Sequence, residues 1–215
     1  MLDMIVKLYE YDTHIDSEKD NAISVTTLIG NMYRAQKYLD KTPQTHKMDF
    51  QFKRSSMIGT AIHDRAERVF KDDPDHIVEQ FVEREIEVDG VVYTIAGSFD
   101  GIRKLNETEW EIYDYKSQYG KDRKEEMLSK DAKQMSIYRW LLEGQYNVTD
   151  RGWTLAISQS NNWQDAIPVE LMSLTDTKDY IEERLYAISN NEKVDCHNTK
   201  YNSCLYCSYS CEERK

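Results

Sequence analysis

The chain has 215 residues, of which 40% are hydrophobic and 31% charged, and its formal net charge is −11. This length is sufficient for one sizeable α/β domain. The acidic balance counts against a general DNA-coating role, which needs a basic surface, but it suits a site where carboxylates hold cations. No apolar run reaches the roughly 18 residues that cross a bilayer, and the N-terminus lacks a signal-peptide core. We therefore expect a cytoplasmic protein with no membrane association.

The N-terminal part of the sequence predicts short elements before the first long helix. Residues 4–9 fit a short leading strand, and residues 13–22 are polar enough for a loop. A helix is expected to begin near Ser24, with Ser24 or Thr26 as its N-cap, and to continue to about Tyr33.

A second helix is expected after a loop over residues 40–54, which would lie near the mouth of the site. Ser55 or Ser56 can cap this helix. Within it, Gly59 lies one turn before His63 and would allow a partner backbone to approach closely. The apolar stripe of the helix consists of Ile58, Ile62, Ala66, Val69 and Phe70.

The hydrophobic pattern then changes to the two-residue period of β-strands. Residues 77–88 and 91–96 alternate on either side of Asp89-Gly90. An Asp-Gly pair between alternating segments is a strong β-hairpin signal. Residues 98–104 continue the second strand, so the sequence predicts the first two strands of an antiparallel meander.

The next strand, residues 109–116, carries the most informative stretch of the chain at its exit. Side chains two residues apart on a strand point to the same face, so Asp114 and Lys116 are expected to project into one pocket. A carboxylate there can hold a divalent cation, and a lysine beside it can orient or deprotonate water, as metal-dependent phosphodiester cleavage requires. The meander also places Asp100 on the strand adjacent to Asp114.

The C-terminal half predicts a helix, a parallel strand and a last helix. On the helix expected at residues 131–143, Gln134 and Tyr138 are four residues apart and share one face. The strand at residues 152–158 follows this helix, and such a crossover makes a parallel pairing with the preceding strand the expected arrangement. The remaining elements are an edge strand and a helix with Thr175 as its N-cap, residues 166–169 and about 175–189.

Four short motifs follow one another along the chain. They are Gly59-Thr-Ala-Ile-His63, Gly97-Ser-Phe-Asp100-Gly101, Asp114-Tyr-Lys116 and Gln134-Met-Ser-Ile-Tyr138. Their order and spacing resemble the RecB-like branch of the PD-(D/E)xK nuclease superfamily, which includes the CRISPR-associated exonucleases. The resemblance runs from about Ser24 to the C-terminus. It implies an α/β fold with a restriction-endonuclease-like core, in which helices flank a central mixed β-sheet.

The resemblance also implies roles for the motif residues. The implied ligands of Mg2+ or Mn2+ are His63, Asp100, Asp114 and the Tyr115 carbonyl. Lys116 would position water or contact phosphate, while Gln134 and Tyr138 would border the site and contact the DNA backbone or the lysine. Glu67 and Glu85 are weaker candidates. Without the motif order, each of these side chains also fits an ordinary surface or core position.

All four cysteines lie in the last twenty residues, as Cys196, Cys204, Cys207 and Cys211. In a reducing compartment, a Cys-x-x-Cys pair with two further cysteines indicates metal binding, by Zn2+ or a 4Fe–4S cluster. The CRISPR-associated and AddB-like nucleases carry a four-cysteine iron–sulfur site, which favours the cluster, but their first ligand lies far upstream. Here no cysteine precedes Cys196, and this compact spacing with His197 as a spare ligand slightly favours zinc.

Taken together, residues 1–195 are expected to form the nuclease domain, and residues 196–215 a metal-binding segment packed on it. The implied activity is a metal-dependent DNA exonuclease of phage or bacterial recombination or repair, acting on DNA with single-stranded ends. A recombination-protein partner or a homo-oligomer could supply further DNA affinity. The alternatives are a structure-specific endonuclease of the same fold and a non-catalytic partner-binding protein. A zinc-binding interaction module would explain only the tail.

Overall fold

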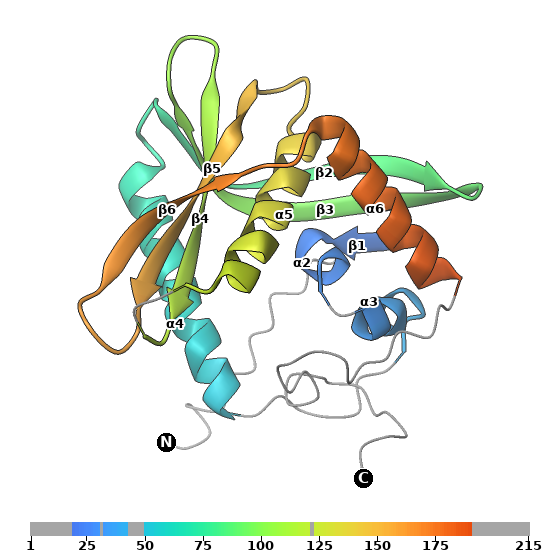
Figure 1. The fold of residues 1–215 in the computed structure, drawn as a ribbon, viewed down its shortest axis with the longest axis horizontal. Coiled ribbons are helices and arrows are strands. Elements are labelled where there is room, and N and C mark those ends of the chain that lie inside the picture. The colour runs from blue at the N-terminus through green and yellow to red at the C-terminus, as the bar shows by residue number, and fades with distance from the viewer. Residues whose placement is uncertain (1–18, 31, 43–49, 121–122, 191–215) are drawn as a thin grey trace.

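A six-stranded mixed β-sheet forms the centre of the protein, with helices packed against it (Figure 1). This computed structural model describes residues 19–30, 32–42, 50–120 and 123–190. The elements are β1 Ala22–Ser24, α2 Val25–Leu28, α3 Met32–Leu39, α4 Phe50–Phe70, β2 His76–Val88, β3 Val91–Lys104, β4 Trp110–Gln118, α5 Glu125–Leu141, β5 Val148–Ser158, β6 Gln164–Glu170 and α6 Leu174–Ser189. The strand order is β1-β3-β4-β5-β6, and β2 pairs with β3. The expected fold class, a central mixed sheet flanked by helices, is confirmed.

Strand β3 connects the two parts of the sheet. Along one edge it pairs antiparallel with β2. Along its other edge it pairs in parallel with β1 at residues 94–96, and antiparallel with β4 at residues 101–104. Between these two partners, residues 97–100 have no ladder partner on that edge among the described strands. The motif that ends in Asp100 therefore occupies an opening in the sheet.

The turn between β2 and β3 confirms the hairpin prediction. Asp89 and Gly90 have φ values of 50° and 76°, and positive φ at both central residues is typical of a two-residue type I′ turn. The residues that flank the turn pair directly, and the same register continues along both strands. This register places Glu79 opposite Asp100. In Figure 1 the hairpin tip projects beyond α6 at the right of the molecule.

Helices α4 and α5 cover opposite faces of β4. Ile112 and Met135 of α5 meet over the neighbouring strand β5. The next residue on β4, Tyr113, makes an edge-to-face contact with His76, which stacks on Phe70 of α4. Since successive strand residues point to opposite faces, the two helices enclose β4 from both sides. The largest fully buried side chains come from the strands and from α2, α5 and α6, and they include Ile23, Leu28, Ile95, Phe99, Ile102, Ile112, Met135, Ile137, Ile181 and Leu185.

The first predicted helix is two helices in the structure. Ser24 is the N-cap of α2, because its Oγ accepts a 3.1 Å hydrogen bond from the Thr27 N–H. The helix ends at Leu28, however, and α3 begins only at Met32. Arg184 of α6 donates hydrogen bonds to carbonyl oxygens at this break, among them that of Leu28. It thereby satisfies carbonyl groups that a helix end leaves without intrahelical partners.

Helix α4 begins earlier than the sequence patterns indicated. It starts at Phe50, so the predicted loop through residue 54 and the cap at Ser55 or Ser56 are wrong. The stretch from residue 50 to residue 58 contains no glycine or proline, so nothing in it opposes a helix. In the apolar stripe Ala66 is buried, but Val69 is 53% exposed and does not belong to the core.

Two further local expectations differ from the structure. The N-cap of α6 is Ser173 instead of Thr175, since Ser173 Oγ accepts a 3.0 Å hydrogen bond from the Asp176 N–H. Gly59 does not mark a close backbone approach, because a Cβ there would meet only Ser117 Oγ at 3.6 Å, which is an ordinary contact. The pairing predictions hold, with β5 parallel to β4 and β6 at the sheet edge.

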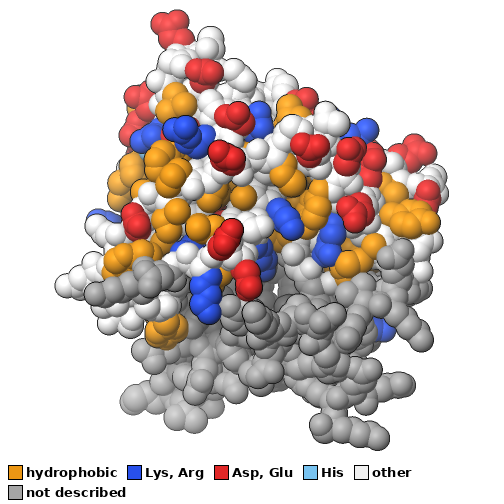
Figure 2. All heavy atoms as spheres, in the orientation of Figure 1, with side chains coloured by type: hydrophobic (Ala, Val, Ile, Leu, Met, Phe, Trp, Pro, Cys, Tyr) orange, Lys and Arg blue, Asp and Glu red, His pale blue; other side chains and the backbone are white. Residues whose placement is uncertain are grey.

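The four cysteines and the strand expected at residues 4–9 lie outside the described residues. Among the residues that are described, no helix has the length and apolar character needed to cross a membrane. Figure 2 shows acidic, basic and hydrophobic side chains interspersed over the described part of one face.

Candidate metal and catalytic site

Asp100 lies at the centre of the candidate site, where β3 passes the opening between β1 and β4. Its side chain is 8% exposed. Oδ2 accepts a 2.6 Å hydrogen bond from the Tyr115 N–H on β4, and Oδ1 lies 3.4 Å from Nδ1 of His63 on α4. One carboxylate therefore connects two strands with a helix from the neighbouring layer.

Asp114 and Lys116 project together from β4, as the strand spacing predicts. Lys116 Nζ lies 2.7 Å from Asp114 Oδ2 and donates a 3.1 Å hydrogen bond to Gln134 Oε1 on α5. The approach of the ammonium to Asp114 has the distance of an ion pair but not the direction of a hydrogen bond. Asp114 Oδ2 is thus a buried carboxylate oxygen that receives no hydrogen bond from the described residues. The charge of this carboxylate is balanced in the structure by the Lys116 ammonium.

Burial is the largest influence on the pKa values of Asp100, Asp114 and Lys116. Burial and the nearby Asp114 carboxylate raise the pKa of Asp100 well above its ordinary value. Burial also raises the pKa of Asp114, although the Lys116 ammonium opposes this shift. For Lys116 itself, burial lowers the pKa, but the carboxylates of Asp114 and Asp100 outweigh burial and raise it overall. Two buried acids close together ionise fully only when further positive charge balances them, and a divalent cation supplies that charge.

His63 joins this group from α4. Its Nδ1 lies 2.9 Å from Glu79 Oε1 on β2. The hydrogen bond to Glu79 raises the pKa of His63, burial lowers it, and the Asp100 carboxylate raises it further. The ligand atoms of His63, Glu79 and Asp100 all lie within 4.8 Å of one another. A nitrogen and two carboxylate oxygens at this spacing can hold one divalent ion.

The sequence patterns missed Glu79 as a site residue. The register of the predicted hairpin could have revealed it, because pairing across Asp89-Gly90 places Glu79 opposite Asp100. The two glutamates considered weaker candidates stay outside the group of ligand atoms. Glu67 is exposed on α4, and Glu85 lies 3.5 Å from Lys19 in an ion pair with a largely exposed carboxylate.

Tyr138 packs from α5 against the opening in the sheet. A Cβ added at Gly97 would lie 2.7 Å from the Tyr138 hydroxyl oxygen. The Tyr138 ring therefore occupies space that is free only because residue 97 has no side chain. Burial and the Asp100 and Asp114 charges raise the pKa of Tyr138 far above its ordinary value, and its hydroxyl stays protonated. Tyr138 is therefore suited to donating a hydrogen bond and not to acting as a base.

We predict that Gly97→Ala lowers the free energy of unfolding by about 1–3 kcal/mol, because the new methyl group overlaps the Tyr138 ring. Adding Tyr138→Phe should recover part of this loss, since it removes the atom closest to the methyl group. Urea unfolding of the single and double variants measures both effects. Gly59→Ala is the matched control, because its Cβ meets only Ser117 Oγ at 3.6 Å. Equal losses at both glycines would contradict the proposed overlap.

A second buried ionic group supports β4 and α5. Arg123 donates a 2.7 Å hydrogen bond to Asp131 Oδ1 and a 3.1 Å hydrogen bond to Gln118 Oε1. Thr154 Oγ1 donates to the other oxygen of Asp131 at 3.2 Å. Both members of the Arg123–Asp131 ion pair are almost completely buried. The network fixes the end of β4, two residues beyond Lys116, against the helix that carries Gln134.

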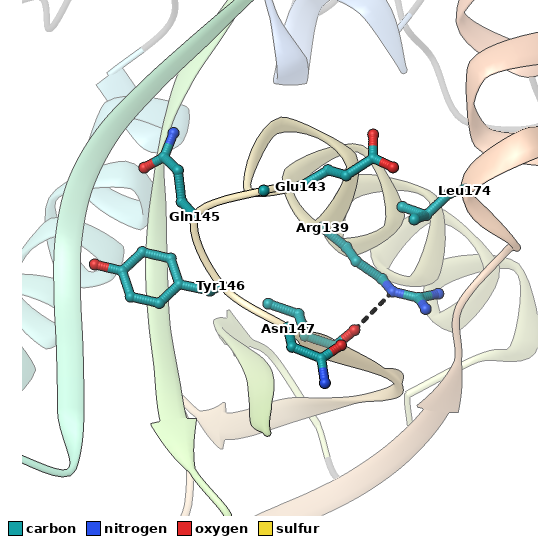
Figure 3. A pocket seen from close by; sticks show the side chains of 8 residues that line it. Arg139, Glu143, Gln145, Tyr146, Asn147 and Leu174 are labelled. Atoms are coloured by element: carbon teal, nitrogen blue, oxygen red, sulfur yellow. Dashed lines mark hydrogen bonds between the residues drawn. The ribbon is translucent and has the colours of Figure 1, made fainter. Parts of the chain in front are cut away.

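A pocket of about 320 Å³ lies apart from this group, at the C-terminal end of α5 (Figure 3). Its arginine, Arg139, is occupied by the backbone, because Nε donates to the Val148 carbonyl at 2.9 Å and a terminal nitrogen donates to the Met172 carbonyl at 3.2 Å. None of the motif residues lines this pocket. The chemistry is thus concentrated at the opening in the sheet and not in the pocket.

The structure brings most of the predicted site residues into one place, namely His63, Asp100, Asp114, Tyr115, Lys116, Gln134 and Tyr138. The Tyr115 N–H is committed to Asp100, and the role of its carbonyl as a ligand stays a prediction. The four cysteines predicted to bind a second metal lie outside the described residues.

Comparison with known proteins identifies the type of domain. The family model described as the PD-(D/E)XK nuclease superfamily matches residues 73–211. No curated protein sequence matches the chain. Among solved structures, the crystal structure of SSO0001 is similar, with a TM-score of 0.68 and 20% sequence identity over 95% of this chain and 93% of that chain. At this identity the likeness shows a shared fold.

Proposed function

The chain belongs to the PD-(D/E)XK nuclease superfamily, and from this premise we propose that it is a divalent-metal-dependent DNA exonuclease of the RecB-like branch, similar to the CRISPR-associated exonucleases. The observation that carries the proposal is the group of two buried carboxylates, Asp100 and Asp114, beside Lys116 and His63. A buried acidic pair with a lysine two residues from one acid is suited to phosphodiester hydrolysis.

In this proposal His63, Asp100, Asp114 and the Tyr115 carbonyl hold Mg2+ or Mn2+. When bound, the ion polarises the phosphodiester and lowers the pKa of water. The fit rests on the burial of the two carboxylates, Asp100 and Asp114, and on His63 Nδ1, which lies 3.4 Å from Asp100 Oδ1. The Tyr115 N–H holds Asp100 Oδ2, which leaves Oδ1 facing His63 for coordination.

Lys116 is the proposed contact to the scissile phosphate or the attacking water. Its raised pKa keeps it an ammonium at neutral pH, so it donates hydrogen bonds to oxygen and stabilises negative charge instead of removing a proton. Gln134 fixes the position of its Nζ. Hydrolysis joins a water oxygen to phosphorus and breaks the opposite P–O bond. Gln134 and Tyr138 border the site from α5 and are proposed to contact the DNA backbone.

The proposed function also assigns a role to the C-terminal segment, a substrate and a cellular process. Residues 1–195 would form the nuclease domain, and Cys196, Cys204, Cys207 and Cys211 would bind Zn2+ or a 4Fe–4S cluster that fixes residues 196–215 to it. The substrate would be DNA with single-stranded ends, in bacterial or phage recombination or repair in the cytoplasm. A recombination protein or a second copy of the chain would supply additional DNA affinity to an acidic protein.

The deciding test is digestion of 5′- and 3′-labelled single- and double-stranded DNA with Mg2+, Mn2+ or EDTA. Stepwise shortening from one labelled end, dependent on the metal, would support an exonuclease and reveal its polarity. Cutting of a circular single strand would favour the endonuclease alternative. Absence of cleavage under every metal would overturn the proposal in favour of a non-catalytic partner-binding protein. An absorption band at roughly 400 nm in the same preparation would assign the cysteines to iron–sulfur.

A further inference from the structure

Glu79 has a backbone conformation that is unusual within a strand. Its φ is +49°, in the left-handed region that residues with a Cβ rarely adopt. The pairing of β2 with β3 is in the same register on both sides of it, with Val78 opposite Gly101 and Gln80 opposite Phe99. The strand therefore keeps its alignment while one residue is turned. Non-glycine residues in such conformations cluster at functional sites.

The turn brings the Glu79 carboxylate to His63 and Asp100. Glu79 Oε1 lies 2.9 Å from His63 Nδ1, which in turn lies 3.4 Å from Asp100 Oδ1. Adjacent ligand atoms of an octahedral ion, with bonds of about 2.1 Å, are about 3.0 Å apart. The His63–Glu79 separation is close to this value, the His63–Asp100 separation is somewhat longer, and all three ligand atoms lie within 4.8 Å of one another.

The net charge of the site is also consistent with one bound divalent ion. Three carboxylates, those of Glu79, Asp100 and Asp114, belong to this site, and the Lys116 ammonium lies 2.7 Å from one of them, Asp114. Three negative charges and one positive charge leave two negative charges when His63 is neutral, and one divalent cation balances them. Asp100 and Asp114 are both almost completely buried, so their charges need such a balance.

We infer that Glu79 is a further ligand of the catalytic ion, in addition to the residues of the four sequence motifs. This inference rests on the proposed nuclease function and adds a third acidic side chain to its metal site. In this structure His63 Nδ1 and Glu79 Oε1 lie 2.9 Å apart. Both groups would hold the ion through their lone pairs, so binding would require a carboxylate at Glu79 and a neutral imidazole at His63.

A different role would be purely supportive, with Glu79 fixing the orientation of the His63 ring through a hydrogen bond. The variant Glu79→Gln separates the two roles. Its amide oxygen still accepts a hydrogen bond from an imidazole N–H, but the negative charge that attracts the ion is lost. Glu87→Gln is the matched control, because Glu87 is an exposed glutamate on the same strand.

The experiment is calorimetric titration of Mn2+ into the full-length, DNA-free protein after treatment with EDTA. We expect Glu79→Gln to weaken Mn2+ binding by more than the about 10- to 100-fold that loss of a supporting partner costs, while Glu87→Gln binds like the wild type. Unchanged affinity in Glu79→Gln would overturn the inference. A wild type that binds Mn2+ but never cleaves DNA would overturn the nuclease function and leave Glu79 as a ligand.

Glu79→Gly tests the same point with less risk of misfolding, since glycine adopts positive φ without strain. Its metal-free melting temperature should equal or exceed that of the wild type. The rise in melting temperature on adding Mn2+ should shrink, because that rise follows the affinity of the folded state for the ion. A rise as large as that of the wild type would contradict the role of Glu79 as a ligand.

Discussion

Replacing Lys116 with alanine is expected to lower the rate of metal-dependent DNA cleavage by about 10²- to 10⁴-fold, the range typical of one well-placed catalytic side chain. The reason is the position of its ammonium, 2.7 Å from Asp114 Oδ2 and held by Gln134 at 3.1 Å. No other lysine on β4 can take this place, since Lys116 is the only one in the strand. The measurement is single-turnover cleavage of end-labelled DNA with saturating Mg2+ or Mn2+.

The effect of Lys116→Ala on the chemistry must be separated from its effect on the fold. Removing the ammonium leaves Asp114 buried beside Asp100 without its ion-pair partner, so Lys116→Met, which preserves the volume of the side chain, is the companion variant. Lys178→Ala is the control, because Lys178 lies on α6 in an exposed ion pair with Glu182 worth at most about 1 kcal/mol. Cleavage at the wild-type rate in both Lys116 variants would remove the lysine from the mechanism.

The second large effect is expected for Asp100→Asn. The new side chain keeps an oxygen that can accept the Tyr115 N–H, so the link between β3 and β4 is preserved. The charge that holds the ion is lost, and cleavage should fall by about 10³-fold or more, equivalent to several kcal/mol of transition-state stabilisation. Wild-type cleavage by this variant would show that the negative charge of Asp100 is not needed for catalysis.

The same substitution should change how stability depends on pH in the metal-free protein. Burial and Asp114 raise the pKa of Asp100 in the folded state, so the unfolded chain releases this proton at lower pH. The folded wild type therefore loses stability as the pH rises from the unfolded pKa of about 4 through the higher folded value. An amide side chain cannot ionise, so Asp100→Asn should show a smaller loss between about pH 4 and neutrality. Urea unfolding in EDTA across this range measures the difference, and parallel curves for the two proteins would contradict it.

The parts of the fold that follow from local patterns were predictable. Asp89-Gly90 between alternating segments specified the β2–β3 hairpin, because few other dipeptides favour two consecutive positive φ values. The β4–α5–β5 order likewise specified a parallel pair. Positions that depend on tertiary contacts were less accurate. At the break after α2, the carbonyl groups are bound by Arg184, which is distant in sequence and has no local pattern that indicates this contact.

In the candidate site too, some residues follow from local sequence patterns and others depend on tertiary contacts. Asp114 and Lys116 follow from the two-residue period of a strand, and their proximity in space follows with it. Glu79 could not be assigned in that way, because its φ of 49° departs from the strand pattern and turns the side chain to His63. The alternation of residues in β2 carries no sign of this local turn. Only the hairpin register, which pairs positions across Asp89-Gly90, connects Glu79 with Asp100.

The opening at residues 97–100 has a mechanical consequence for the sheet. It divides the described strands into two panels, one of β1, β2 and β3 and the other of β4, β5 and β6, whose backbone ladder is confined to the pairing of residues 101–104 with β4. Asp100 and Asp114 lie on opposite sides of this seam. A cation held by both carboxylates would link the two panels across this seam, so the rigidity of the whole sheet would depend on whether the metal site is occupied.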